Sequence, residues 1–137
     1  MAAYLQKPLF MTDFDVHSLK GIRILIIDDS DMMIQFLQLI LEKKGAIVIA
    51  KEDAFDGIDF FHSKTADCDI VLMDMQLPSM DGHTAAREIR KFRSYLPIIA
   101  ISADDSIDSF FDGHVQKPVE ANSLYAEILR ILKQRQQ

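Results

Sequence analysis

The stretch IVLMDMQLPSMDG, residues 70–82, decides the fold class of this chain. Apolar residues of strand length lead to one carboxylate, Asp74, and the chain then turns through Pro78 and Gly82. A carboxylate at the end of a core strand is costly to bury unless a partner compensates its charge. The stretch therefore predicts a buried strand that ends at a charged site.

The composition fits one domain with a single core. The chain has 137 residues, of which 49% are hydrophobic, and this length is too short for two comfortable cores. Residues 1–20 show neither helical nor strand periodicity. We therefore predict a tail or linker over residues 1–20 and one domain over residues 21–137.

Charge and hydropathy disfavour several function classes. The net charge of −6, without a block of Lys or Arg, argues against a nucleic-acid surface. No apolar run has the length of a membrane span, and the first residues do not resemble a signal peptide. The single cysteine, Cys68, rules out an internal disulfide and fits a reducing compartment. We expect a cytoplasmic domain that contacts neither nucleic acid nor membrane, which leaves open a membrane anchor elsewhere in a parent protein.

Strand-like and helical runs alternate along the chain. Predicted strands cover residues 22–27, 46–50, 68–74, 96–102 and 114–116, and predicted helices cover residues 31–45, 53–63, 83–92, 105–112 and 122–133. The first, third and fourth strands are apolar almost throughout, as expected for a parallel sheet covered on both faces. We predict a doubly wound α/β fold with five parallel strands. In such folds ligands bind beyond the carboxyl ends of the strands.

Polar side chains follow four of these strands. They are Asp28 and Asp29 after the first, Asp74 after the third, Ser102 after the fourth and Lys117 after the fifth. Crowded carboxylates repel one another unless they take up protons or bind a cation. Oxygen ligands suit Mg²⁺, and an ammonium and a hydroxyl suit phosphoryl oxygens. A carboxylate between a metal and a cation is suited to attack phosphorus, so the pattern predicts an acyl phosphate on Asp74.

The combination of ILIIDDS, IVLMDMQLPSMDG, IIAIS and KP closely resembles the receiver domain of two-component response regulators and hybrid histidine kinases. The similarity extends from Ile22 to Lys133. It implies the flavodoxin-like fold of CheY-like receivers. It also implies a phosphohistidine on a histidine kinase or a histidine phosphotransfer protein as the phosphoryl donor.

The resemblance assigns a role to each acid of the pattern. Asp74 would be the phosphoacceptor and one of the magnesium ligands. Asp29 would be a direct magnesium ligand, and Asp28 would act largely through water. The backbone carbonyl of Gln76 would be the third protein ligand.

The same resemblance covers the remaining motif residues. Ser102 fills the place of the Thr or Ser of the family, which acts in catalysis and in the conformational switch. Lys117 fills the place of its lysine and is followed by Pro118. Pro78 and Gly82 match the loop after the phosphorylation site.

Three features depart from the family pattern. The interval from Ser102 to Lys117 is shorter than expected by about seven residues, roughly two helical turns, so we predict a shortened fourth helix. The switch position three residues before the lysine holds His114 instead of Tyr or Phe, which is either a simple substitution or a smaller, pH-sensitive switch. Gln76 and Asp104 occupy positions that influence the lifetime of the acyl phosphate in this family.

Three functions compete on this evidence. The first is a phosphoacceptor signalling domain, which would dephosphorylate itself without being a multiple-turnover enzyme, and which either stands alone or belongs to a hybrid histidine kinase. The second is a receiver-like interaction scaffold that no longer uses phosphorylation. The third is a haloacid-dehalogenase-type phosphohydrolase, for which residues 29–31 would supply a DxD element. The downstream partner and a weak homodimer stay open.

Overall fold

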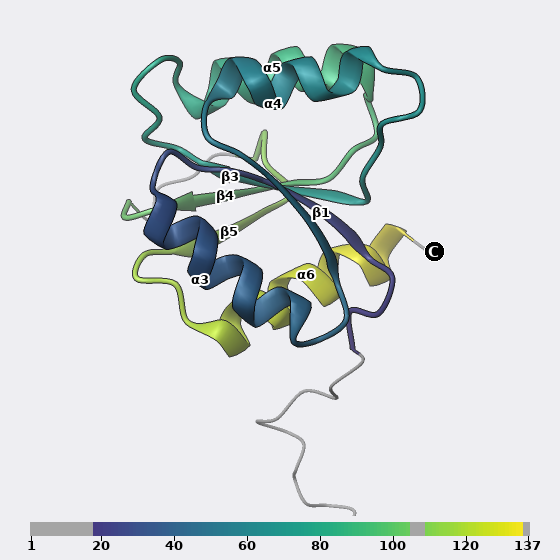
Figure 1. The fold of residues 1–137 in the computed structure, drawn as a ribbon, viewed down its shortest axis with the longest axis vertical. Coiled ribbons are helices and arrows are strands. Elements are labelled where there is room, and N and C mark those ends of the chain that lie inside the picture. Colours follow the sequence, from purple (N-terminus) through teal and green to yellow (C-terminus); the bar gives the residue numbers. More distant parts are fainter. Residues whose placement is uncertain (1–17, 105–108, 136–137) are drawn as a thin grey trace, which may run out of the picture.

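The computed structural model describes residues 18–104 and 109–135, and its centre is one five-stranded sheet (Figure 1). The strands are β1 (Arg23–Ile27), β2 (Ile47–Lys51), β3 (Ile70–Asp74), β4 (Ile98–Ser102) and β5 (Gly113–Gln116). They lie in the order β2-β1-β3-β4-β5, and every neighbouring pair is parallel. This confirms the predicted doubly wound sheet. Because the strands are parallel, all their carboxyl ends lie at one edge of the sheet.

Helices cover both faces of the sheet. On one face lie α4 (Ala54–Asp59), which continues into the short 3-10 helix η1 (Phe60–His62), and α5 (Gly82–Phe92) (Figure 1). On the other face lie α3 (Asp31–Glu42) and α6 (Ala121–Arg135). None of the helices in the described ranges combines the length and apolar character that a bilayer crossing requires.

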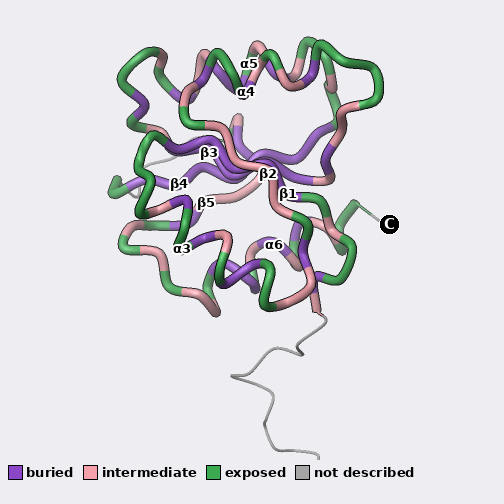
Figure 2. The backbone as a smooth tube through the Cα atoms, in the orientation of Figure 1, coloured by how far each residue is buried: buried purple, intermediate pink, exposed green. Residues whose placement is uncertain are grey.

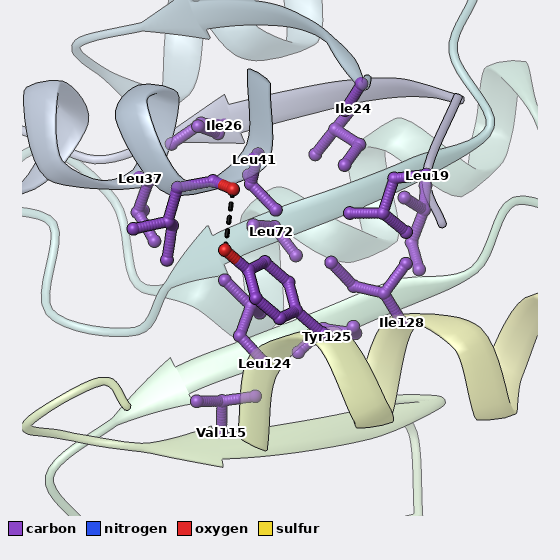
Figure 3. Close-up of a cluster of buried hydrophobic side chains, with 14 of the residues drawn as sticks. Leu19, Ile24, Ile26, Leu37, Leu41, Leu72, Val115, Leu124, Tyr125 and Ile128 are labelled. Carbon is purple, nitrogen blue, oxygen red and sulfur yellow. Dashed lines mark hydrogen bonds between the residues drawn. The ribbon is translucent and has the colours of Figure 1, made fainter. Parts of the chain in front are cut away.

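Each face of the sheet has its own core, as the buried segments of Figure 2 show. The core under α3 and α6 contains the buried residues labelled in Figure 3, and there the Tyr125 hydroxyl donates a hydrogen bond of 2.7 Å to the carbonyl of Ile40. This bond ties α6 to α3. On α3 the buried side chains include Ile34, Leu37 and Leu41, whereas Phe36 is 37% exposed.

The packed domain includes Leu19, which belongs to the predicted tail. Its side chain is fully buried in the core under α3, and its N–H donates to the carbonyl of Lys44 at 2.9 Å. The packing thus begins before the predicted boundary at residue 21. Residues 1–17 lie outside the described residues, so the tail stays a prediction.

The connection from β4 to β5 differs from the predicted helix 105–112. Residues 105–108 lie outside the described residues, and residues 109–112 form turns and bends rather than a helix. Phe111 is buried in the core under α4 and α5 instead. The described part of this connection is therefore not the predicted helix, and its Phe111 ring packs in the core.

Candidate functional site

The acidic side chains predicted to meet at the sheet edge do meet there. Asp28 follows the end of β1 and Asp74 is the last residue of β3. Asp28, Asp29 and Asp74 each offer a carboxylate oxygen, and these oxygens lie within 4.8 Å of one another. Asp28 is 2% exposed and Asp74 is 3% exposed, whereas Asp29 faces solvent. We call Asp28, Asp29 and Asp74 the acidic group; it consists of two buried carboxylates and one that faces solvent.

Asp74 receives two hydrogen bonds on one oxygen. Lys117 donates from Nζ to Asp74 Oδ1 at 3.1 Å, and the backbone N–H of Gln76 donates to the same oxygen at 3.0 Å. The ammonium reaches the site because β5 ends next to β4, where the N–H of Lys117 donates to the carbonyl of Ser102 at 2.9 Å. Lys117 thus forms an ion pair with Asp74 but with neither Asp28 nor Asp29.

Asp28 is only partly compensated. Its Oδ1 accepts the N–H of Ser30 at 2.8 Å, while its buried Oδ2 accepts no hydrogen bond from the described residues. Burial raises the pKa of Asp28 to about 6, and the negative charge of Asp74 adds to this rise. One oxygen of this buried carboxylate is therefore left without a hydrogen-bond partner among the described residues.

Ser102 and its loop complete the edge. Ser102 ends β4, is 4% exposed, and accepts the N–H of Asp104 on its Oγ at 3.0 Å. Pro118 follows Lys117 across a cis peptide bond and is exposed. The structure thus brings all five predicted strand-end residues to one edge, with Asp104 and Pro118 in the loops beside them.

The loop after Asp74 is held by close packing. Its last residue, Asp81, caps α5 by accepting the N–H of Thr84 at 2.9 Å. A Cβ at Gly82 would overlap the end of the Met75 side chain and lie 3.1 Å from the Met75 Cα, so a larger residue here would require Met75 to shift.

His114 lies on the edge strand β5, which β4 separates from β3 and Asp74. It is part of β5, its N–H donates to Oε2 of Glu127 at 3.0 Å, and its buried Nε2 has no hydrogen-bond partner among the described residues. Sequence reasoning did not identify Glu127, because its contact to β5 depends on how α6 packs. Asp31 of the alternative DxD reading is exposed in the first turn of α3, outside the acidic group.

Comparison with known proteins identifies the family. The family model for the response regulator receiver domain matches residues 24–129. A CheY-like receiver domain protein from Methanospirillum hungatei has the same fold, with a TM-score of 0.77 at 24% identity over 85% of this chain and 98% of that one. The fold around the acidic edge is therefore that of CheY-like receivers.

Curated relatives carry such a domain within longer chains. The uncharacterized transcriptional regulatory protein YbdJ of Bacillus subtilis is 32% identical over 84% of this chain and 52% of its own length. The autoinducer 1 sensor kinase/phosphatase LuxN of Vibrio campbellii is 29% identical over 74% of this chain and 12% of its own length. The chain thus spans about half of the first relative and a small part of the second. It belongs to the response regulator receiver domain family of two-component systems.

Proposed function

We propose that this domain accepts a phosphoryl group from a phosphohistidine onto Asp74, with Mg²⁺, and so switches a partner surface in a phosphorelay. The observation that carries the proposal is the buried Asp74 carboxylate, which contacts Lys117 at 3.1 Å and has two further carboxylates within 4.8 Å. A site built only for structure would pair these acids with cations of the protein itself.

The donor set fits Mg²⁺. The unpartnered Oδ2 of Asp28, the exposed Asp29 and the carboxylate of Asp74 present oxygen ligands from one group. We assign the backbone carbonyl of Gln76 as a further ligand, because the N–H of the same residue donates to Asp74 and so holds the loop beside the site. Bound Mg²⁺ supplies positive charge that offsets the carboxylates and attracts phosphoryl oxygens.

The residues of the chain supply the rest of the chemistry. Lys117 and the N–H of Gln76 both bind Oδ1 of Asp74, so we assign its Oδ2 as the nucleophile. This oxygen forms the new O–P bond while the N–P bond of the phosphohistidine breaks. The electron pair of the broken N–P bond stays with the imidazole. Lys117 can then bind a phosphoryl oxygen, and the Ser102 hydroxyl can turn from the Asp104 N–H to donate to another.

The surface beside the site suits a protein donor. Helix α3 starts just after the acidic loop, and Met32 is 81% and Leu39 68% exposed on it. Exposed apolar side chains next to a reactive group are typical of a protein contact. The similarity to LuxN, a sensor kinase by its name, supports a histidine kinase or a histidine phosphotransfer protein as the donor.

The remaining roles follow from the same site. We assign His114 and Ser102 to the switch, and Gln76 and Asp104 to the rate at which water removes the phosphoryl group. The domain would act once per phosphoryl group and dephosphorylate itself, in the cytoplasm. A downstream partner or a weak homodimer would read the switched surface.

Phosphorylation by a small donor tests the proposal. The full chain is incubated with acetyl phosphate and Mg²⁺ and followed by intact mass, beside Asp74→Asn, Lys117→Ala and the control Asp112→Asn, whose carboxylate lies outside the acidic group. We expect one added phosphoryl group in the wild type and the control, none in Asp74→Asn, and none without Mg²⁺. An unlabelled wild type, under conditions that label another receiver domain and with a phosphohistidine protein also failing, would favour the scaffold function.

A further inference from the structure

A groove between α4 and α5 is not used by the proposed phosphorylation chemistry. It encloses about 620 Å³ on the face of the sheet covered by these two helices. Three apolar side chains, Phe55, Ile58 and Met80, and three acidic ones, Asp56, Asp59 and Glu88, are among the residues that line it. The groove therefore combines apolar contact area with negative charge.

The apolar part of the groove has one exposed ring above a packed base. Phe55 is 58% exposed on α4. Ile58 and Met80 are partly buried and pack against the core under α4 and α5. A fixed apolar base beside an exposed aromatic ring is the arrangement that binds a bulky side chain of a partner.

The acidic part of the groove is only partly neutralised by nearby basic side chains. Residues 52–62 contain four acids, Glu52, Asp53, Asp56 and Asp59, and no Lys or Arg. Two of the acids in the groove have local partners: Glu88 pairs with Lys91 at 2.7 Å and Asp59 with His62 at 3.1 Å. Asp56 forms no ion pair within the described ranges. The α4 side of the groove thus carries uncompensated negative charge.

We propose that this groove is a docking site for a cationic amphipathic segment of a partner protein. The segment would place an apolar side chain against Phe55 and Met80 and a Lys or Arg beside Asp56. Charge complementarity selects this occupant over two others. A second copy of this chain has a net charge of −6, and residues 1–17 hold one Lys against Asp13 and Asp15, so neither brings an excess of Lys or Arg to the acids.

The groove and the proposed phosphorylation site use different side chains. None of the groove residues belongs to the acidic group at the sheet edge. Met80 does lie in the loop that connects Asp74 to α5, so one wall of the groove shares a segment with the site. The proposal can therefore fail while the phosphoacceptor role holds, and the reverse is also true.

A peptide titration of the full chain tests the proposal. The probe is a short peptide of Leu and Lys at amphipathic helical spacing, followed by the backbone amide shifts of the isotope-labelled protein. Two matched peptides accompany it: one with Glu in place of every Lys, and one with Ser in place of every Leu. We expect saturable shifts centred on residues 54–62 and 80–92 for the first peptide only, and weaker binding as salt rises.

Variants of the protein sharpen the same titration. Phe55→Ala and the double change Asp56→Asn and Asp59→Asn should each weaken binding about tenfold, as when one anchoring side chain is removed. Tyr95→Ala removes an aromatic side chain that is 64% exposed and does not line the groove, so it is the matched control and should bind as the wild type does. The amide spectrum of each variant shows whether it folds.

Three results would overturn the proposal. They are shifts spread over all acidic surfaces, shifts on α3 or α6 instead of the groove, and equal affinity of the wild type and both groove variants. Stronger binding after removal of residues 1–17 would show that this segment occupies the groove itself. A normal yield of phosphorylated protein in Phe55→Ala, expected in every case, separates this test from the test of Asp74.

Discussion

Two carboxylates at opposite edges of the sheet, Asp74 at the carboxyl end of β3 and Asp112 just before β5, show how differently one protein can treat a partly or fully buried acid. Asp112 has every oxygen occupied: Oδ2 accepts from Arg90 at 2.6 Å and from the N–H of Ile98 at 2.8 Å, and Oδ1 accepts from Arg135 at 2.9 Å. Its partners come from α5, β4 and α6. We refer to Asp112 with Arg90 and Arg135 as the Asp112 cluster.

The acidic group at the sheet edge has the opposite balance. Asp74 has one cationic partner, Lys117, although two more acids lie within 4.8 Å. Burial raises the pKa of Asp28 to about 6, and its Oδ2 has no partner among the described residues. The Asp112 cluster satisfies its acid and holds elements together. The acidic group leaves negative charge unmatched, and this is what a site for a cation and a phosphoryl group requires.

The largest effect should come from removing a charge of the acidic group. Asp29→Asn should weaken Mg²⁺ binding by about a thousandfold, because a carboxylate about 4 Å from a divalent cation contributes about 4 kcal/mol at an effective dielectric constant of about 40, between bulk water and a protein surface. Calorimetric titration with Mg²⁺ measures the change. Asp31→Asn, which changes an exposed neighbour outside the group, is the control and should bind nearly normally. Equal losses in both variants would mean that only overall charge attracts the ion.

The pKa of Asp28 predicts a pH-dependent stability difference. Its folded-state pKa of about 6 lies above the ordinary value of 3.8, so the ionised form destabilises the fold without Mg²⁺, fully above about pH 6 and not at all below about pH 4. Asp28→Asn should therefore be more stable than the wild type by up to about 3 kcal/mol at pH 8. The gap should close as the pH falls to 4. Urea unfolding followed by circular dichroism measures it, and a gap that does not change with pH would contradict the account.

The Asp112 cluster should respond in the other direction. Asp112→Ala leaves the Ile98 N–H and two guanidinium groups without their acceptor, which should lower the free energy of unfolding by about 2 kcal/mol at neutral pH. The control is Glu88→Ala, whose ion pair with Lys91 is exposed and should contribute less than about 1 kcal/mol. If Asp112→Ala lost Mg²⁺ binding but kept its stability, the roles of the two regions would be reversed.

The smallest effect concerns His114. Its buried Nε2 has no hydrogen-bond partner in the described part of the chain, so His114→Phe should keep or raise stability by about 1 kcal/mol or less. Gln116→Ala, at an exposed position of the same strand, is the control for a change in β5 itself. A loss of more than about 2 kcal/mol in His114→Phe would show that the imidazole is a satisfied part of the core.

The sequence carried enough information to predict the acidic edge but not the Asp112 cluster. Each of four predicted strands ends at or just before one of four polar residues, Asp28, Asp74, Ser102 and Lys117. The geometry of a parallel sheet alone then places their side chains at one edge. Each of these residues can therefore be identified from a short sequence motif. The order of the strands needed the structure.

The remaining features depend on contacts between distant residues. Arg90 and Asp112 are separated by 22 residues and belong to no motif, so their ion pair has no local signal. The same holds for the acidic groove, because α4 and α5 come together only in the folded chain. The predicted helix 105–112 was wrong for residues 109–112, which form turns and bends with Phe111 buried and which contain no strong helix former.

Locating the phosphoryl group on the chain tests the central claim most directly. The chain is phosphorylated with acetyl phosphate and Mg²⁺ and treated with borohydride, which reduces an acyl phosphate of aspartate to homoserine, and the peptides are sequenced by mass spectrometry. We predict homoserine in place of Asp74 and at no other aspartate. Homoserine at Asp28 or Asp29, or a phosphoryl group that borohydride does not remove, would contradict the assignment of Asp74 as the phosphoacceptor.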